Sequence, residues 1–203
     1  MLNALGRILV KLFAAHTELH PSEQCAHCGS QLARELDEPV HAWRCLNPDC
    51  PPEVLRRLTL WVSPEVMDIQ NCDAAVLKQL VERGLVRDSA DFYRLNPAEL
   101  TSLEGMSMKP ARALVDAIEA SKQRETWRVL FGLGIPQLGG EEAKALCGHF
   151  DSLQDLFAAA RERLLELEGI SETTARQLKR WLGDPVNRKL VRRLERAGVN
   201  FKC

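Results

Sequence analysis

The sequence is poor in aromatic residues and carries no excess of charge of either sign. Of 203 residues, 5% are aromatic, with a single tyrosine, and the formal net charge at pH 7 is -1. Leucine and alanine dominate windows with helical spacing, so we predict a mainly α-helical protein with aliphatic packing. The near-zero charge excludes attraction of the whole molecule to nucleic acid, and any basic surface must be local.

The composition argues against a disordered chain and against a membrane protein. Hydrophobic residues make up 45% and charged residues 27% of the chain, which is ordinary for a globular protein. Residues 1–21 place their apolar side chains along one side of a helix, so we predict an amphipathic packing helix there. The alternative is a signal peptide, which is disfavoured because Lys11 interrupts a short apolar run and a cysteine cluster follows.

Four of the seven cysteines form two close pairs, which is the pattern of a metal site rather than of a secreted disulfide framework. The pairs are Cys25-x2-Cys28 in CAHCGS and Cys45-x4-Cys50 in CLNPDCPP. Two tight turns of this kind can place four thiolates on one tetrahedral Zn2+, at about 2.3 Å each. Since four sulfurs leave no position for water, the predicted zinc is structural and holds together residues 22–54. Redox cysteines and buried small side chains are the alternatives, and the pattern indicates a reducing, cytoplasmic compartment.

The remainder of the chain, residues 55–203, contains an internal repeat. The stretch LEGMSMKPARAL at 103–114 returns as LEGISETTARQL at 167–178. Possible hairpin turns lie at residues 71–73 (turn 1), 105–107 (turn 2), 137–139 (turn 3) and 169–171 (turn 4), spaced by 34, 32 and 32 residues. Alanine stands six residues after the first position of turns 2 to 4, where a small side chain lets two helices approach closely. Apolar positions that predict short packed helices before turns 2 and 4 are Phe92, Leu100, Leu103, Leu156, Leu164 and Leu167.

The spacing of apolar residues, glycines and alanine in these turns resembles the helix-hairpin-helix motif. In that motif, backbone N–H groups of the turn and of the next helix point at a phosphate oxygen, assisted by the helix dipole. Such contacts read no bases, so the resemblance implies sequence-independent binding of double-stranded DNA. The predicted contact residues in the turns are Gly105, Ser107, Lys109, Gly139, Gly140, Gly169 and Ser171.

The turns depart from the motif unevenly. Serine replaces the second glycine at Ser107 and Ser171, and we expect a left-handed serine to cost on the order of 1 kcal/mol. Serine should therefore weaken phosphate binding without abolishing it, and replacing both serines by glycine should tighten it. Turn 1 carries Asp73, which would repel phosphate and is better interpreted as a helix cap. The alternative for all the turns is a repeat that serves packing or a protein partner.

Residues 172–202 form a basic end on an otherwise neutral chain. They include nine Lys or Arg against three acidic residues. Within PVNRKLVRRLERAGV, apolar side chains can face inward while the basic side chains remain exposed. Arg192 and Arg193 are the predicted DNA contacts here, although a run of charge is often only a solvated face.

Together, the cysteine segment, the four turns and the connecting stretches IEASKQR, LFGLGI and HFDSLQDL resemble the zinc finger and helix-hairpin-helix region of bacterial NAD-dependent DNA ligases. The resemblance covers roughly residues 22 to 200. It implies a small four-cysteine zinc finger followed by a tandem helix-hairpin-helix domain that encircles duplex, possibly nicked, DNA. The implied setting is DNA replication or repair, near the nucleoid.

The chemistry of that family is not carried by these residues. The ligases form an AMP-lysine adduct within a Lys-x-Asp-Gly motif, and no lysine here begins that tetrapeptide. We find no room for the oligonucleotide-binding barrel before Cys25 or a BRCT domain after Cys203, and no alternative catalytic constellation. We therefore predict no catalytic residue and no NAD bound to this chain. A separately encoded adenylation chain could still complete an active ligase in trans, and so enzymatic activity stays open.

Overall fold

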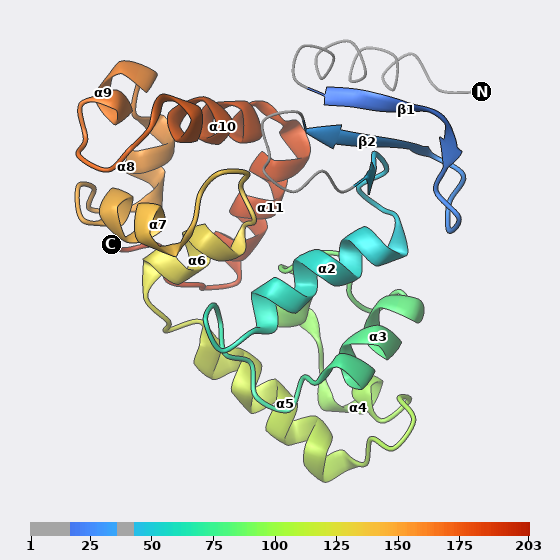
Figure 1. The fold of residues 1–203 in the computed structure, drawn as a ribbon. Coiled ribbons are helices and arrows are strands. Elements are labelled where there is room, and N and C mark those ends of the chain that lie inside the picture. The colour runs from blue at the N-terminus through green and yellow to red at the C-terminus, as the bar shows by residue number, and fades with distance from the viewer. Residues whose placement is uncertain (1–16, 36–42) are drawn as a thin grey trace. The chain divides into compact units, whose positions relative to one another are not determined.

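The computed structural model describes residues 17–35 and 43–203 (Figure 1). The chain divides into two compact units, Met1–Val54 and Leu55–Cys203. Residues 1–16 of the expected N-terminal helix lie outside the described residues. Residues 17–21, which we also expected in that helix, instead belong to strand β1.

The first unit contains a three-stranded antiparallel sheet that the cysteine spacing did not predict. Its order is β1-β2-β3, formed by Thr17–Gln24, Gln31–Glu35 and Arg44–Cys45. Leu19 pairs with Ala33, and the register shifts between Leu19 and Gln24, just before the first cysteine pair. The sheet brings the two pairs together, because Cys25 and Cys28 lie between β1 and β2 while Cys45 ends β3, which pairs with β2.

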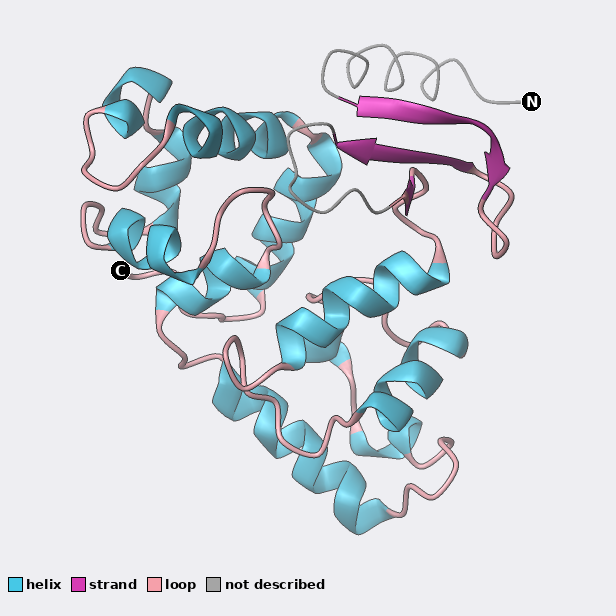
Figure 2. Ribbon diagram, viewed as in Figure 1, coloured by secondary structure: helices cyan, strands magenta, loops and turns pink. Residues whose placement is uncertain are grey.

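Helices dominate the rest of the described chain, which confirms the mainly helical prediction (Figure 2). They are α2 (Pro51–Val62), α3 (Ala74–Glu82), the 3-10 turn η1 (Phe92–Arg94), α4 (Pro97–Leu100), α5 (Met108–Ser121), α6 (Thr126–Gly132), α7 (Gly140–Cys147), α8 (Leu153–Ala158), α9 (Arg161–Leu165), α10 (Glu172–Gly183) and α11 (Pro185–Arg196). Among the residues that the structure describes, no helix is both long and apolar enough to cross a membrane.

The core of the second unit is mostly aliphatic, as the scarcity of aromatics indicated. Leu77, Leu114 and Leu146 are fully buried, and the aromatic exceptions among the described core residues are Trp61, Phe92 and Phe201. All six apolar positions assigned to the short helices before turns 2 and 4 are buried. Removing such side chains from water is the main favourable contribution to folding.

Each predicted turn leads directly into a helix. Turns 1 to 4 precede α3, α5, α7 and α10, and the third residue of each turn is the N-cap of the helix that follows. Three alanines lie six residues after the first position of turns 2 to 4, and all three are completely buried: Ala111, Ala143 and Ala175. The repeat is therefore one of local structure as well as of sequence.

Candidate functional sites: a cysteine cluster and four turns

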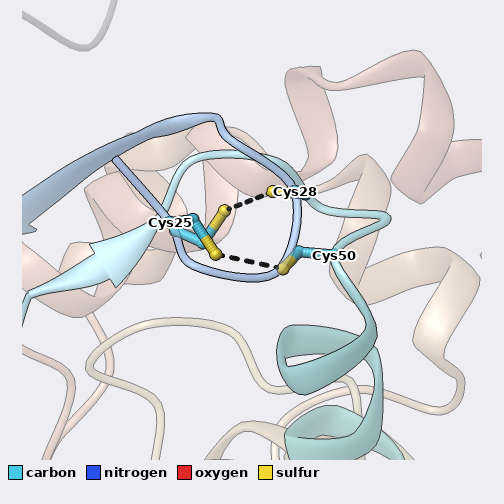
Figure 3. Close-up of side chains that lie close together, drawn as sticks. Cys25, Cys28 and Cys50 are labelled. Carbon is cyan, nitrogen blue, oxygen red and sulfur yellow. Dashed lines mark hydrogen bonds between the residues drawn. The ribbon is translucent and has the colours of Figure 1, made fainter. Parts of the chain in front are cut away.

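The four cysteines converge on one point. The Sγ atoms of Cys25, Cys28, Cys45 and Cys50 all lie within 4.8 Å of one another. Figure 3 shows the sulfur of Cys25 facing that of Cys50. These two Sγ atoms are 3.5 Å apart, and the Sγ atoms of Cys28 and Cys45 are 3.3 Å apart. A tetrahedron with Zn–S bonds of about 2.3 Å has sulfurs about 3.8 Å apart. The cluster could therefore hold a metal ion with little movement of its side chains.

Two compact turns position these thiols. Gly29 adopts a φ of 69°, which favours glycine, and its N–H donates to the Cys25 carbonyl at 2.8 Å. In the second turn, the N–H of Asn47 donates to the Cys45 sulfur, and the Asn47 side chain accepts from the Asp49 N–H. N–H groups that point at a sulfur stabilise the thiolate form that metals require.

The thiol pKa values suit a site that needs a cation. Hydrogen bonds from Ser30, first from its side chain and then from its backbone, lower the pKa of Cys28 to about 6. Burial raises the pKa of Cys45 to about 11, and burial also raises that of Cys50. Four thiolates in one place repel each other, and a divalent cation removes both that repulsion and the protons. The donor set thus fits a soft metal such as Zn2+, which binds sulfur tetrahedrally.

Turns 1 to 4 share one backbone geometry. The first residue is left-handed in every turn, with φ of 65° at Asn71, 75° at Gly105, 59° at Gln137 and 81° at Gly169. In turns 2 to 4 the N–H of the second residue donates to the carbonyl three residues earlier, at 3.2 to 3.3 Å. Each of these hydrogen bonds closes a four-residue β-turn whose third residue is the left-handed one. A positive φ at that position is typical of a type II β-turn, and proline is common at the position before it, where Pro136 precedes Gln137.

The second residue of each turn is apolar and points into the protein. Cys72, Met106, Leu138 and Ile170 are all buried, as are Ile69, Leu103, Ile135 and Leu167 two positions before the turns. Each turn is therefore fastened to the core on both sides of its left-handed residue. The backbone N–H groups at the tip can then be held in place without support from a ligand.

The expected cost of serine in these turns is wrong. Ser107 has a φ of -85° and Ser171 a φ of -76°, both extended conformations that any residue adopts. The left-handed position lies two residues earlier, and the residues under strain there are Asn71 and Gln137. The serines serve as N-caps, so the backbone argument for replacing them with glycine no longer holds.

Turn 1 is a helix cap. The Asp73 carboxylate accepts a hydrogen bond from the N–H of Val76 at 2.8 Å. This confirms the interpretation of Asp73 as a cap. Because its carboxylate occupies the N-terminus of α3, an approaching phosphate would meet a like charge.

Turns 3 and 4 are also partly occupied by their own side chains. At turn 3, the Glu142 carboxylate accepts from the N–H of Gly139 at 3.1 Å. At turn 4, the Ser171 hydroxyl accepts from the N–H of Thr174 at 3.0 Å, and the first residue of α10 is the acidic Glu172. Both α7 and α10 therefore carry negative charge in the first turn, which the glycine and serine pattern did not reveal.

Turn 2 is the most open of the four. The Ser107 hydroxyl makes no capping hydrogen bond, and α5 has no acidic residue in its first turn. Ser107 and Lys109 are both exposed. The first N–H groups of a helix have no partner within it, which leaves those of Met108 and Lys109 at the start of α5, since Pro110 in the next position has no N–H. This combination of free donors and positive charge suits an anion.

Hydrogen bonds join the turns in pairs. Gln79 of α3, the helix after turn 1, accepts from the N–H of Glu104 beside turn 2 at 2.7 Å. Thr174 of α10, the helix after turn 4, donates its hydroxyl to the carbonyl of Gln137 in turn 3 at 3.1 Å. Turns 1 and 2 form one pair and turns 3 and 4 the other. Sequence spacing did not indicate this pairing.

The two basic residues predicted on α11 are not equivalent. Arg192 is exposed. Arg193 is only partly exposed and forms ion pairs with Asp88 and, at 2.6 Å, with Asp91. Arg193 therefore joins α11 to the segment just before η1, and its positive charge is largely compensated within the protein. The distance of more than 100 residues between the partners left no local signal for this pairing.

Comparisons with known proteins agree with the motifs. A family model described as a helix-hairpin-helix motif matches residues 128–191, which include turns 3 and 4. A DNA ligase of Synechococcus sp. (strain CC9605) is 39% identical over 209 residues, covering 98% of this chain and 30% of the relative. A DNA ligase of Petrotoga mobilis is 38% identical over 198 residues, covering 97% of this chain and 30% of the relative.

A DNA ligase of Koribacter versatilis is 38% identical over 180 residues, which cover 89% of this chain and 26% of the relative. The chain thus spans about 30% of the length of the curated relatives that it matches. The resemblance to DNA ligases inferred from the sequence motifs is confirmed.

Proposed function

We propose that this chain binds the sugar-phosphate backbone of duplex DNA without sequence preference, through a helix-hairpin-helix module, in DNA replication or repair. The proposal is supported by the similarity to DNA ligases over nearly the whole chain and by the motif match over residues 128–191. Backbone N–H groups bind phosphate irrespective of the base, so affinity should fall steeply with salt and vary little with sequence.

The observation that carries the proposal is the start of α5. Turn 2 combines an exposed Ser107 without a capping bond, an exposed Lys109 and a first turn without acids. Turns 3 and 4 contribute less, because the Glu142 carboxylate occupies the N–H of Gly139 and the Ser171 hydroxyl occupies the N–H of Thr174. Turn 1 contributes packing only. Of the predicted basic contacts, Arg192 remains in the proposed interface, whereas Arg193 acts inside the protein.

The metal in the proposed function is a structural Zn2+. Cys25, Cys28, Cys45 and Cys50 would hold it with all four coordination positions filled by sulfur. The ion would supply cross-linking of two turns and no catalytic chemistry. No NAD contact is part of the proposal.

A second candidate function is a share in DNA ligation, with an adenylation chain supplied in trans. It is favoured by the name of the relatives, DNA ligase. Mixing this protein with an adenylation domain that lacks the corresponding region would test it. Restored sealing of a nicked duplex supports the candidate, and no gain in sealing contradicts it.

The direct test is Ser107→Asp, measured by fluorescence anisotropy on nicked, intact and single-stranded DNA at two salt concentrations. Ser107 makes no capping hydrogen bond, and the third residue of α5 is Pro110, which has no N–H, so the substitution removes no existing bond and the fold should be retained. Its charge beside the N–H groups of α5 should weaken duplex binding about tenfold, which corresponds to about 1.4 kcal/mol.

Ala120→Asp is the matched control, because it adds the same charge to the same helix about 20 Å further along. It should change the affinity by less than about twofold at 0.15 M salt, where screening acts over about 8 Å. Equal weakening by both variants would contradict a phosphate contact at turn 2. Failure of the unaltered protein to bind any DNA at low salt would contradict the proposed function itself.

A further inference from the structure

Turn 3 differs from the other turns because a carboxylate of its own helix lies on it. The N–H of Gly139 donates to Oε2 of Glu142 at 3.1 Å. A Cβ atom built on Gly139 would lie 2.8 Å from that same oxygen. The carboxylate therefore covers the face of Gly139 that a phosphate would have to approach.

The neighbouring turns show that this arrangement is particular to turn 3. The residue at the same position of the repeat is Pro110 after turn 2 and Thr174 after turn 4. Neither carries charge, and Thr174 directs its hydroxyl to the carbonyl of Gln137. Glu142 is the third residue of α7, where a glutamate commonly accepts from the N-cap N–H. The same bond that stabilises the helix thus places an anion at the turn.

We propose that Glu142 acts as an internal competitor for phosphate at turn 3, so that this turn binds DNA only after the carboxylate has moved aside. This inference rests on the proposed function of the module. An N–H can serve one anion at a time, and the Glu142 carboxylate would repel any phosphate that came near while it stayed in place. Because Glu142 is only partly buried, its side chain can turn towards solvent without disrupting the core.

The arrangement gives turns 2 and 3 different roles. Turn 2 is open at rest, whereas turn 3 is closed at rest, and Thr174 links turn 3 to the helix that follows turn 4. Binding through turn 2 would raise the local concentration of phosphate at turn 3 and so favour displacement of the carboxylate. Glu142 would then tune affinity for duplexes long enough to reach both turns.

The test is Glu142→Gln, with Glu141→Gln as the matched control. Glutamine is nearly isosteric and still accepts from an N-cap N–H, so the helix start is retained while the charge is lost. Glu141 is exposed, adjacent in the same first turn, and pairs with Lys144 rather than with the turn. The Glu141→Gln substitution releases Lys144 from its ion pair, which can only strengthen DNA binding by the control. Any additional tightening by Glu142→Gln therefore understates the effect of Glu142.

We expect Glu142→Gln to tighten binding of a 20-base-pair duplex by about threefold to tenfold at low salt, and Glu141→Gln by less than about twofold. If turn 3 gains a phosphate, the slope of log K against log salt should steepen by about 0.9 for Glu142→Gln alone. Glu142→Ala, which empties the position, should also tighten binding. Circular dichroism would verify that each variant is folded.

Equal affinities and equal salt slopes for the Glu142→Gln and Glu141→Gln proteins would overturn the inference while leaving the proposed function intact. Absence of DNA binding by the unaltered protein and all variants would instead remove the proposed function. As a direct readout, the amide signal of Gly139 in a 15N spectrum should shift on addition of duplex. A Gly139 amide signal that does not shift when the protein is saturated with DNA would also overturn the inference.

Discussion

At turn 3, a glutamine adopts the left-handed backbone conformation that glycine adopts at turns 2 and 4. A side chain in this region meets the following carbonyl, at a cost of roughly 1–2 kcal/mol. The strain in the repeat therefore lies at Gln137, not at Ser107 or Ser171 as the glycine pattern suggested. Asn71 in turn 1 is under less strain, because asparagine tolerates this region better than most residues.

Gln137→Gly should raise the free energy of unfolding by about 0.5–1 kcal/mol, because relief of the left-handed strain exceeds the added entropy of the unfolded chain. Gln137 is exposed, so little packing is lost. Asn71→Gly is the matched control and should gain only a few tenths of a kcal/mol. Urea unfolding monitored by circular dichroism would measure both. A larger gain for Asn71→Gly than for Gln137→Gly would contradict this assignment of strain.

At the scale of elements, the two units depend on different interactions. The sheet of the first unit is small, with β3 only two residues long, and the described part of it has one buried strand residue, Ala33. A segment of about 30 residues rarely buries a core large enough to offset the conformational entropy of ordering it. The helices after turns 1 to 4 are fastened by many buried aliphatic residues and need no metal.

Chelation of the metal should unfold the first unit and leave the helices of the second unit intact. The expected result is loss of the amide signals of residues 24–33 from a 15N spectrum, with most of the helical circular dichroism retained. Cys45→Ser should have the same effect without a chelator, since it removes one ligand. Cys72→Ser, which alters a buried cysteine outside the cluster, is the control and should leave the signals of residues 24–33 in place. An unchanged spectrum after chelation would contradict a structural metal.

At the scale of the whole second unit, ion pairs join segments that are distant in sequence. Arg193 of α11 reaches Asp88 and Asp91, and Arg124 pairs with Asp68. The N–H of Asn200 donates to the carbonyl of Lys122 at 2.8 Å. These contacts join the last helix, the middle of the repeat and its beginning, and one of them uses Arg193, which the sequence alone would offer to DNA.

Arg193→Ala should lower the free energy of unfolding by about 1–2 kcal/mol, because it leaves two partly buried carboxylates without their partner. Arg192→Ala, on the exposed side of the same helix, should change it by less than about 0.5 kcal/mol. Thermal and urea unfolding would separate the two variants. Equal free energies of unfolding for the Arg193→Ala and Arg192→Ala proteins would show that Arg193 does not join α11 to Asp88 and Asp91 in solution.

The same ion pair predicts a pH dependence. Burial acts to raise the pKa of Asp91, but hydrogen bonds from the backbone N–H of Arg87 and from the Arg193 side chain outweigh it and hold that pKa below its usual value. A depressed pKa contributes stability above the unfolded value of about 3.9, and this contribution is lost as the pH falls through the folded pKa. Asp91→Asn should therefore be less stable than the unaltered protein at pH 7, with a difference that narrows below about pH 4.

The sequence by itself determined the features that repeat locally. Period and spacing located the four turns, the helices after them, the buried alanines and the four cysteines, because each depends on a few residues that lie close together in the chain. The three strands were missed, since the cysteine spacing reveals the turns but not what supports them.

Only the tertiary structure decided which groups remain available to a ligand. It showed that Arg193 is paired with Asp88 and Asp91, and that Gln79 and Thr174 join the four turns in two pairs. The physical reason is that a donor or a charge can be satisfied by any group that the fold brings within about 3 Å, and sequence order does not record that distance.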